Sequence, residues 1–401
     1  MEIIITALFG LESLVRQDLE HIGYDKSDIQ VQDGQVILSV PKNKVAQAVA
    51  RVNLWVRHGE RVLLSLGTFR ATTFDDFFEG IEKMPWEEWI PESFAFHVNG
   101  YSRKSQLFGI PACQSLCKKA IVKRLIEKGR GKGSQYISEN PEIGLLNVRF
   151  GIVSDNVRMM MDTSGDGLHK RGYRPLRHIA PIKETLASGL VMLSKYQPFG
   201  YEAVVDPCCG SGTIVIESAL AGLNIAPGLN RPFDAQRWPF VGARVFAEAR
   251  EEAKDMVIKP TKDGAFYFGS DIDGRAVSNA IQNARAAGVE SVTRFKTEDL
   301  RKQDPEALAA WTGLDRQLVV CNPPYGGRMM TEEEAVELFG SIGHTYLDRD
   351  GFCKKGIRLT VISPDDSFEK AVGRNADKRI KLYNGNIRCQ MNHYFRMIKT
   401  M

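Results

Sequence analysis

Long hydrophobic runs, a leader sequence and a cysteine framework are all missing from this chain of 401 residues. The longest apolar runs, such as Leu318–Cys321 and Ile3–Ile5, are far too short to cross a bilayer. No basic-then-apolar segment with a cleavage site opens the chain. The seven cysteines are odd in number and scattered, which argues against a disulfide framework or a four-cysteine zinc site. We therefore expect a cytoplasmic protein with free thiols, no membrane partner and no bound metal.

A large excess of charge is also missing, because the formal net charge is only +4. Its distribution is more informative. Thr72–Glu92 holds seven acidic residues and one basic residue, whereas Arg103–Lys132 holds nine basic residues and one acidic residue. A block of one sign is a candidate surface for phosphate groups. The candidate RNA-binding residues in this block are Arg103, Lys104, Lys118, Lys119, Lys123 and Arg124. The alternative is the solvated face of a helix over Ala112–Glu127, whose other face has apolar residues at helical spacing.

The first half of the chain mixes strand and helix signals. The predicted strands are Glu2–Leu8, Gln35–Val40, Arg61–Leu66, Phe94–Asn99, Leu145–Phe150 and Asn156–Asp162, and the predicted helices are Leu11–His21, Lys42–Arg51 and Ala112–Glu127. Such a mixture is typical of an α+β fold. The stretch Asp162–Pro175, rich in Gly, Asp, His and Arg, has the composition of a linker.

Strands and helices alternate in the second half. The predicted strands are Glu202–Val205, Ala265–Gly269, Arg294–Thr297, Leu318–Val320 and Arg358–Ser363, with predicted helices over Thr213–Ala221 and Gly274–Ala287. Alternation of this kind indicates a parallel, doubly wound, Rossmann-like α/β sheet, in which ligands bind at the carboxyl ends of the strands. Each motif described next lies at such an end.

The first motif runs from Asp206 to Thr213, straight after a predicted buried strand. Gly210 and Gly212 allow a tight turn and a close approach of the backbone to a ligand. The patterns G-x-G-x-x-G and G-K-[ST] are both absent, and no lysine is present to meet a phosphate. The motif therefore favours an uncharged or zwitterionic nucleoside, whose ammonium group Asp206 could meet. The alternative is a purely structural strand-turn-helix.

Two further acidic positions follow predicted strands. Asp271, in Gly269-Ser270-Asp271-Ile272-Asp273, is placed to accept hydrogen bonds from ribose hydroxyls, as an acidic residue does in dinucleotide folds. Asp273 is instead suited to capping the helix that begins at Gly274. Asp299 could accept from an adenine amino group, or it could be an ordinary loop carboxylate.

The most specific motif is Asn322-Pro323-Pro324-Tyr325-Gly326, after the predicted strand Leu318–Cys321. Prolines remove backbone donors, so the loop presents carbonyl oxygens, and the side chain of Asn322 adds another acceptor. Two acceptors can hold both hydrogens of a planar NH2 group. Tyr325 offers a face on which a flipped-out base can stack.

Taken together, these residues resemble the THUMP-domain RNA methyltransferases of the class I, Rossmann-like type, above all the bacterial enzymes that make N2-methylguanosine in 23S ribosomal RNA. The matching stretches are Ser164–Arg174, Ala180–Ala187, Asp206–Thr213 and Asn322–Gly326. The resemblance implies a ferredoxin-like segment over residues 1–60, a THUMP domain over 61–165, a linker over 166–180 and a seven-stranded methyltransferase domain over 181–401. It also implies that the last strands, Arg358–Ser363 and Arg388–Ile398, form a hairpin.

The resemblance further implies S-adenosylmethionine as the cofactor and RNA, in particular 23S ribosomal RNA, as the partner. The expected cofactor-binding residues are Asp206, Cys208, Gly210, Ser211, Gly212, Thr213, Asp271, Ile272 and Asp299. The expected catalytic residues are Asn322, Pro323, Pro324 and Tyr325. Arg171 and Arg174 are interpreted as a clamp on RNA, with a solvated linker as the alternative.

Other functions stay open at this stage. Asn-Pro-Pro-Tyr is shared with enzymes that methylate adenine N6 and protein glutamine, so the motif indicates the type of nitrogen and not the base. An adenine-N6 methyltransferase acting on DNA or RNA, a protein glutamine methyltransferase and a non-catalytic RNA-binding protein are therefore the alternatives. The sequence leaves the target nucleotide and the oligomeric state undetermined.

Overall fold

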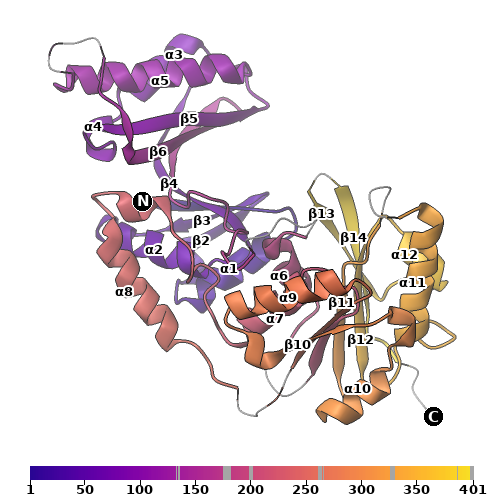
Figure 1. The fold of residues 1–401 in the computed structure, drawn as a ribbon. Helices are drawn as coiled ribbons and strands as arrows, with labels where there is room; N and C mark the ends of the chain where they lie inside the picture. The colour runs from indigo at the N-terminus through magenta and orange to yellow at the C-terminus, as the bar shows by residue number, and fades with distance from the viewer. Residues whose placement is uncertain are drawn as a thin grey trace.

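The computed structural model of the chain describes residues 1–131, 133, 136–174, 182–197, 202–260, 264, 266–325, 330–385 and 387–397. These residues form two seven-stranded sheets, one in each half of the chain, with helices packed against them (Figure 1). The predicted organisation, an α+β first half followed by an α/β second half, is confirmed.

The first sheet runs without a break through residues 2–162, in the order β2-β3-β1-β4-β7-β6-β5. Its strands are β1 (Glu2–Ala7), β2 (Ile29–Gln32), β3 (Gln35–Ser39), β4 (Gly59–Arg70), β5 (Phe94–Arg103), β6 (Asn140–Val153) and β7 (Asn156–Asp162). Neighbouring strands are antiparallel except β5 and β6. Strand β4 pairs first with β1 and then with β7, with a bulge between Ser65 and Gly67, so it joins the two parts of the sheet. The domain boundary at residues 60/61 stays a prediction.

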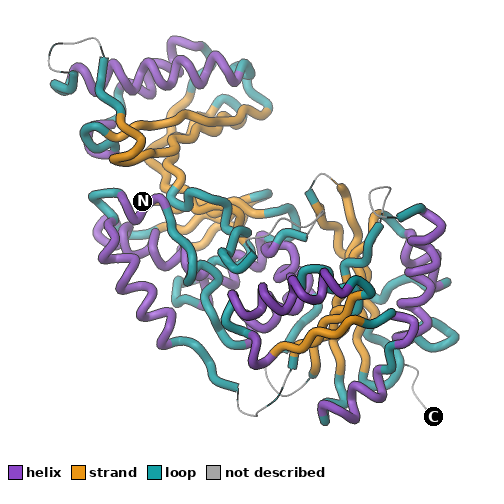
Figure 2. The backbone as a smooth tube through the Cα atoms, viewed as in Figure 1, coloured by secondary structure: helices purple, strands orange, loops and turns teal. Residues whose placement is uncertain are grey.

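Helices cover one face of this sheet. They are α1 (Glu12–His21), α2 (Val45–Trp55), α3 (Phe74–Glu82), α4 (Trp86–Trp89) and α5 (Ile110–Glu127). Alternate residues of the strands point toward these helices and share one hydrophobic core with them, which extends from Ile3 and Val62 to Phe96 and Phe150. Figure 2 shows α3 and α5 as a separate layer on the outer side of β5 and β6.

The second sheet has the order β10-β9-β8-β11-β12-β14-β13. Its strands are β8 (Ala203–Asp206), β9 (Tyr267–Asp271), β10 (Thr293–Thr297), β11 (Gln317–Cys321), β12 (Ile357–Pro364), β13 (Lys378–Asn384) and β14 (Ile387–Tyr394). The first five strands are parallel, and β14 is antiparallel to both β12 and β13. Two separate hydrophobic cores, one on each face, bury the parallel strands. The accompanying helices are α6 (Glu184–Leu193), α7 (Thr213–Gly222), α9 (Gly274–Ala286), α10 (Pro305–Thr312), α11 (Glu332–Tyr346) and α12 (Ser367–Val372).

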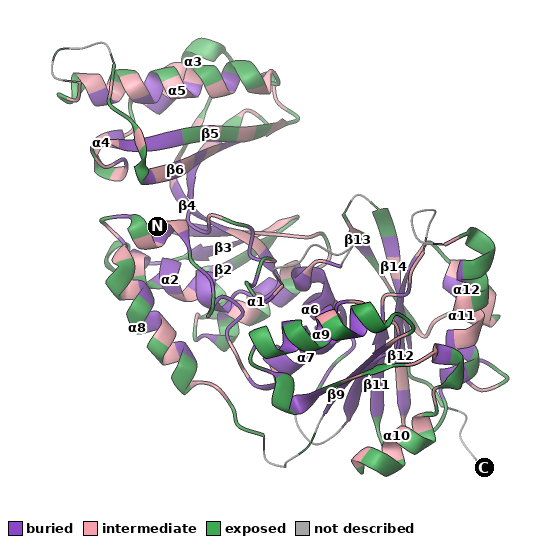
Figure 3. Cartoon of the chain, viewed as in Figure 1, coloured by how far each residue is buried: buried purple, intermediate pink, exposed green. Residues whose placement is uncertain are grey.

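One segment of the second half belongs to the core of the first half. Residues 226–256, which include α8 (Gly242–Asp255), place Trp238 and Phe246 in the same hydrophobic core as α2. Figure 3 shows α8 alongside α2. Arg51 of α2 reinforces the contact with a two-pronged hydrogen bond to Glu252 of α8, at 2.8 and 3.1 Å. The two halves are therefore held together by the packing of residues 226–256 against the first half, as well as by the connecting segment.

The predicted hairpin is wrong in its partner. Strand β14 does lie beside β12, but the hairpin is formed by β13 and β14, and β14 inserts between β12 and β13. The chain leaves β12 through α12 and reaches the edge of the sheet before it returns. The sequence analysis also missed β2, β13 and the helices α3, α4, α6, α8, α10, α11 and α12. Within the described ranges, no helix combines the length and the apolar character needed to cross a membrane.

Candidate active site

Both central motifs meet where the second sheet reverses its strand order. Strands β8 and β11 are parallel neighbours, but the chain proceeds from β8 outward to β9 and β10 before it returns to β11. Ligands of such sheets bind at this switch point, outside the carboxyl ends of the strands. Asp206 ends β8, and Asn322 directly follows β11, so the fold brings the two motifs to one edge.

The loop after β8 is built around two glycines in the left-handed region. Gly212 has φ +79°, and a Cβ there would lie 2.9 Å from both Ala280 and Phe295, so close packing requires glycine. Gly210 has φ +51°, and a Cβ there would meet nothing within 4 Å. The loop therefore packs tightly against α9 and β10 at Gly212 and leaves open space at Gly210.

Asp271 fastens this loop to β9. Its Oδ2 accepts a hydrogen bond from the Gly210 N–H at 2.9 Å, and its Oδ1 accepts one from the Asp273 N–H at 2.9 Å. Asp273 in turn caps α9 by accepting from the Arg275 N–H at 2.8 Å, which confirms the capping role considered for it.

Asp206 is a buried acid that forms no ion pair with any residue that the structure describes. It is 1% exposed, and its carboxylate accepts one hydrogen bond, from the Cys208 N–H at 3.2 Å. Burial, with a smaller contribution from the negative charge of Asp271, raises the pKa of Asp206 to about 8. A cationic group arriving here would restore the ionised form, so the site fits an ammonium group.

A cleft of about 430 Å3 lies beside these residues. It brings together five of the residues expected at the site, and Pro207 of the first motif lies with them. The five are Cys208 from the first loop, Asp271 and Ile272 from the second, Asp299 from the third and Pro324 from the fourth. Helix α11 closes the cleft with Glu334, Glu337, Leu338 and Ser341, which the sequence analysis missed because nothing local marks them. Ile272 is 69% exposed, so it presents an apolar surface at this cleft.

Asp299 is held by its own neighbour. The Arg301 guanidinium donates to both carboxylate oxygens, at 2.7–3.1 Å, and the Arg301 N–H donates at 3.0 Å. These hydrogen bonds lower the pKa of Asp299 to about 2. The carboxylate is therefore fully ionised at neutral pH and lines the cleft as an acceptor.

Asn322 has an orphaned acceptor. Its Oδ1 is buried and finds no hydrogen-bond partner among the residues that the structure describes. Such an oxygen costs free energy unless a donor reaches it. The hydroxyl of Tyr325 accepts from the Asn384 amide at 2.9 Å and lies 3.5 Å from the sulfur of Cys389. The β13–β14 hairpin thus fixes Tyr325, while Gly326 lies outside the described residues.

Two other expected cofactor residues are buried at the end of the loop after β8. Ser211 and Thr213 are buried, and the hydroxyl of Thr213 accepts from Arg174 at 3.0 Å. Arg174 also forms an ion pair with Glu184 at 2.9 Å. The second carboxylate oxygen of Glu184, Oε2, is buried without a hydrogen-bond partner in the described part of the chain. Glu184 is therefore a further candidate for the ammonium group, and an unpaired buried oxygen is not visible in a sequence.

The interpretation of Arg171 as an RNA contact is corrected by its burial. Arg171 is 4% exposed, and its guanidinium donates to the backbone carbonyls of Leu168 and Arg57 at 2.7 and 2.5 Å. It also pairs with the buried Glu217 at 3.4 Å. These contacts connect the first half of the chain to α7, so Arg171 holds the two halves together and is closed to a polynucleotide. Residues 175–180 of the expected linker lie outside the described residues.

Three of the basic residues expected to bind RNA on α5 have acidic partners. Lys118 pairs with Glu139 at 2.7 Å, Lys123 with Glu82 at 2.6 Å and Arg124 with Glu87 at 2.7 Å. The acidic and basic blocks of the sequence are therefore folded against each other. Arg103, Lys104 and Lys119 are exposed. RNA binding by this group of residues stays a prediction.

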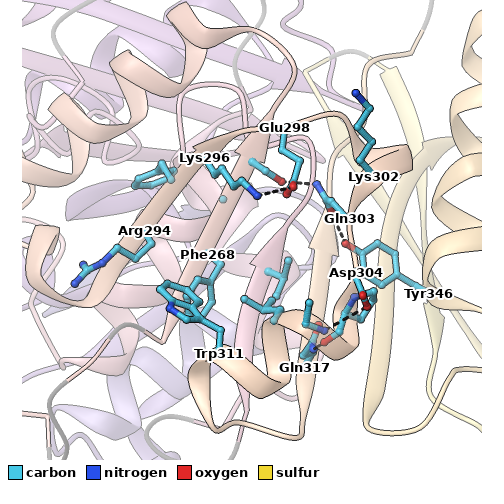
Figure 4. A pocket seen from close by; sticks show the side chains of 17 residues that line it. Phe268, Arg294, Lys296, Glu298, Lys302, Gln303, Asp304, Trp311, Gln317 and Tyr346 are labelled. Atoms are coloured by element: carbon cyan, nitrogen blue, oxygen red, sulfur yellow. Dashed lines mark hydrogen bonds and ion pairs between the residues drawn. The ribbon is translucent and has the colours of Figure 1, made fainter.

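A second cavity, of about 510 Å3, lies under α10 on the face of the sheet (Figure 4). Phe268 and Trp311 meet edge to face on one side of it, with ring centroids 5.7 Å apart. On the other side, Gln303 accepts from the Tyr346 hydroxyl at 2.7 Å. Glu298 lines both this cavity and the cleft at the strand ends. A search of the described ranges for three or more His, Cys, Asp or Glu side chains able to share a metal ion finds no such group.

Comparison with known proteins agrees with this arrangement. A methyltransferase domain family described as RMKL-like matches residues 171–393, the RlmL ferredoxin-like domain matches residues 2–63, and the THUMP domain matches residues 71–141. The chain is 36% identical over 398 residues to the putative RNA methyltransferase YpsC of Bacillus subtilis, covering 99% of this chain and 96% of the relative.

Two other relatives add to this. The ribosomal RNA large subunit methyltransferase K/L of Syntrophotalea carbinolica is 32% identical over 97% of this chain, which covers 53% of that longer protein. The crystal structure of SMU.472, a putative methyltransferase complexed with SAH, is 33% identical, covers 99% of both chains and superposes with a TM-score of 0.85. The cofactor is S-adenosylmethionine, and the chain belongs to the RlmL-like family of THUMP-containing methyltransferases.

Proposed function

We propose that this RNA methyltransferase modifies the exocyclic N2 amino group of a guanine in 23S ribosomal RNA. The observation that carries the proposal is the orphaned Oδ1 of Asn322 at the switch-point edge, because it requires a donor such as an N–H. The ribosomal RNA large subunit methyltransferase K/L among the relatives supports ribosomal RNA as the substrate. The RMKL-like and THUMP matches support a methyltransferase joined to an RNA-binding domain.

Asn322 and Pro323 have the chemistry to hold the target amino group. Oδ1 of Asn322 accepts one hydrogen and the Pro323 carbonyl accepts the other, which fixes the plane of the group and points the nitrogen lone pair toward the cleft. Tyr325 supports the base with its ring while its hydroxyl stays bound to Asn384. These residues contribute positioning and electrostatic stabilisation rather than a strong base.

The surrounding residues fit the cofactor. Asp271 accepts from the ribose hydroxyls, Ile272 covers the adenine ring, and Asp299 accepts from the adenine amino group. Asp206 and Glu184 are the two candidates for the ammonium group, since both are buried acids. Among the described residues, Asp206 forms no ion pair and Oε2 of Glu184 has no hydrogen-bond partner. When bound, S-adenosylmethionine supplies an electrophilic methyl group at the open end of this edge.

The test is methyl transfer to natural RNA. Ribosomal RNA and DNA from a strain that lacks the gene are incubated separately with the purified chain and methyl-labelled cofactor, then digested and separated into nucleosides. We expect the label in N2-methylguanosine from 23S RNA and none in DNA. Label in N6-methyladenosine would establish adenine as the target, and label in DNA alone would overturn the proposal.

A further inference from the structure

The face of the first sheet that α3 and α5 leave uncovered carries a grid of side chains from four strands. Register places Arg103, Val153, Asn156 and Arg70 in one row, Tyr101, Gly151, Arg158 and Thr68 in the next, and Asn99, Arg149, Met160 and Ser65 in the third. Alternate residues of β5 on this side, from His97 to Arg103, are exposed, whereas those of the other side face the helices.

The opposite face is closed. Phe77 and Ile81 of α3 and Cys117 and Ile121 of α5 pack there in the hydrophobic core. In Figures 1 and 3 these helices lie on the side of the sheet away from the rest of the chain, so the uncovered face looks toward the ferredoxin-like segment and the methyltransferase domain. A polymer bound on this face would point toward the half that carries the active site.

Tyr101 lies over a glycine on this face. A Cβ at Gly151 would sit 2.9 Å from both Cζ and the hydroxyl oxygen of Tyr101, so the absence of a side chain at Gly151 makes room for the ring. Tyr101 is nevertheless 51% exposed. One side of the ring therefore rests against the sheet, and the remaining surface is open for stacking.

Several arginines lie on the same face of the sheet as this tyrosine. Arg70 and Arg103 are exposed, and neither forms an ion pair with a residue that the structure describes. Arg158 pairs loosely with Glu2 at 3.5 Å, and Arg149 is 3.0 Å from the buried Asp162, which Arg61 also contacts. The acidic groups facing this surface are thus outnumbered by arginines. On α5, by contrast, Lys118, Lys123 and Arg124 each have a carboxylate within 2.7 Å.

We propose that this uncovered face, and not the basic helix α5, is the surface that binds the RNA substrate, and that it takes a single-stranded segment. One unpaired base stacks on Tyr101, while Arg70, Arg103 and Arg158 meet the flanking phosphates. An aromatic ring bordered by cations is the arrangement that recognises single-stranded nucleic acid, since a base in a duplex has no free face. The inference rests on the proposed function, because it takes RNA as the substrate.

The experiment measures binding of the full chain to a labelled single-stranded RNA and to the same strand in a duplex. We expect Tyr101→Ala to weaken single-strand binding by about 5- to 150-fold, the equivalent of one lost base stack of about 1–3 kcal/mol. Tyr101→Phe keeps the ring and should bind like the wild type. In the double variant Arg103→Ala/Arg158→Ala, the slope of the logarithm of the binding constant against the logarithm of the salt concentration should become shallower by about 0.7 for each lost phosphate contact.

Lys119→Ala is the matched control, because it also removes one exposed cation, but from α5 on the other face. It should leave binding within about twofold of wild type, as expected for a solvated surface charge. Unchanged cofactor binding by calorimetry shows that each variant is folded.

Four results would overturn the inference. If Tyr101→Ala binds RNA like the wild type while Lys119→Ala loses affinity, the RNA binds on α5. If Tyr101→Ala loses the same affinity for the single strand and for the duplex, stacking on Tyr101 is excluded. If RNA is bound and methylated but neither face matters, the surface is wrong and the proposed function survives. If the wild type neither binds nor methylates RNA, the proposed function fails with it.

Discussion

The two sheets of this molecule offer different places for a ligand. The methyltransferase sheet is covered on both faces by hydrophobic cores, so its parallel strands are accessible only at their ends, where Asp206, Asp271 and Asn322 stand. The first sheet is covered on one face by helices, and its other face presents Tyr101 and several arginines. A site on strand ends is made of loops, each continuous in sequence, whereas a site on a face is made of single residues from several strands.

This difference assigns separate tasks to the two halves. Loop residues at the strand ends can approach a small cofactor closely from several sides. A flat face with alternating side chains can contact a long polymer over a wide area. The buried contacts of Arg171 with Arg57 and Glu217 hold these two surfaces in a fixed relation. The following variants test whether each residue has the role proposed for it in its half of the chain.

The largest effect is expected for Arg171→Met. Breaking a buried ion pair and leaving Glu217 unpaired should cost about 3–5 kcal/mol of unfolding free energy. The measurement is denaturant unfolding, with Lys119→Met as an exposed control that should change little. If Arg171→Met has wild-type stability but fails to bind RNA, Arg171 contacts RNA as the sequence predicted, and its structural role is wrong.

Asn322→Ala tests the strand-end site. Removing one preorganised acceptor should lower the single-turnover rate of methyl transfer about 10²- to 10³-fold, while cofactor affinity changes little. Rate and cofactor binding are measured on the same preparation. Tyr325→Phe is a useful companion, because it keeps the ring and loses only the hydroxyl contact with Asn384. Wild-type transfer by Asn322→Ala would remove the main reason for an amino-group target.

The strand-end loops are the part that the sequence could predict. Asp206–Thr213 and Asn322–Tyr325 are short contiguous motifs, and both lie at the edge expected for them. Arg171 was misplaced because a local stretch of basic residues does not reveal burial, which here depends on Glu217 far along the chain. The pairs that neutralise α5 join residues 21–41 positions apart, such as Lys118 with Glu139 and Lys123 with Glu82.

Other unpredicted features depend on long-range strand register. Tyr101 and Gly151 are 50 positions apart in sequence, and neither is unusual alone. The same holds for β13, whose partner in the sheet is β14, the strand that itself lies beside β12. Contacts of this kind are decided by which strands pair and in which register, so a local pattern does not contain them.

Asp271→Ala should have a smaller effect, confined to the cofactor. The loss of charged hydrogen bonds to the ribose should weaken binding by about 1.5–3 kcal/mol. Asp271 also holds the Gly210 N–H, so calorimetry is combined with a thermal unfolding midpoint to separate binding from loop stability. Asp273→Ala is the control, since Asp273 caps α9 and should affect stability more than affinity. An unchanged dissociation constant in Asp271→Ala would transfer the ribose to another acceptor.

The smallest effect is expected for the pH dependence of cofactor affinity. This dependence identifies the acid that binds the ammonium group of the cofactor. Because burial raises the pKa of Asp206 to about 8, its carboxyl is protonated at pH 6 in the cofactor-free protein. A folded-state pKa above the unfolded value of 3.8 means that the stability of the free protein falls as the pH rises from about 4 to about 8. An ammonium group favours the ionised carboxylate, so binding should release about one proton. Affinity should therefore rise with pH, by at most about tenfold per pH unit, until the α-amino group of the free cofactor itself titrates at about 7.7–8.0.

Calorimetry in two buffers of different ionisation enthalpy counts this proton at a pH below that limit. Asp206→Asn should abolish the release and flatten the pH dependence of affinity. Glu184→Gln is the matched variant, because burial also raises the pKa of Glu184 and its Oε2 has no hydrogen-bond partner in the described part of the chain. If proton release persists in Asp206→Asn and disappears in Glu184→Gln, the ammonium partner is Glu184, and the acid of the first motif serves to shape the loop. Release that survives in both variants would place the amino-acid end of the cofactor away from both carboxylates, and the assignment of this end of the site would be wrong.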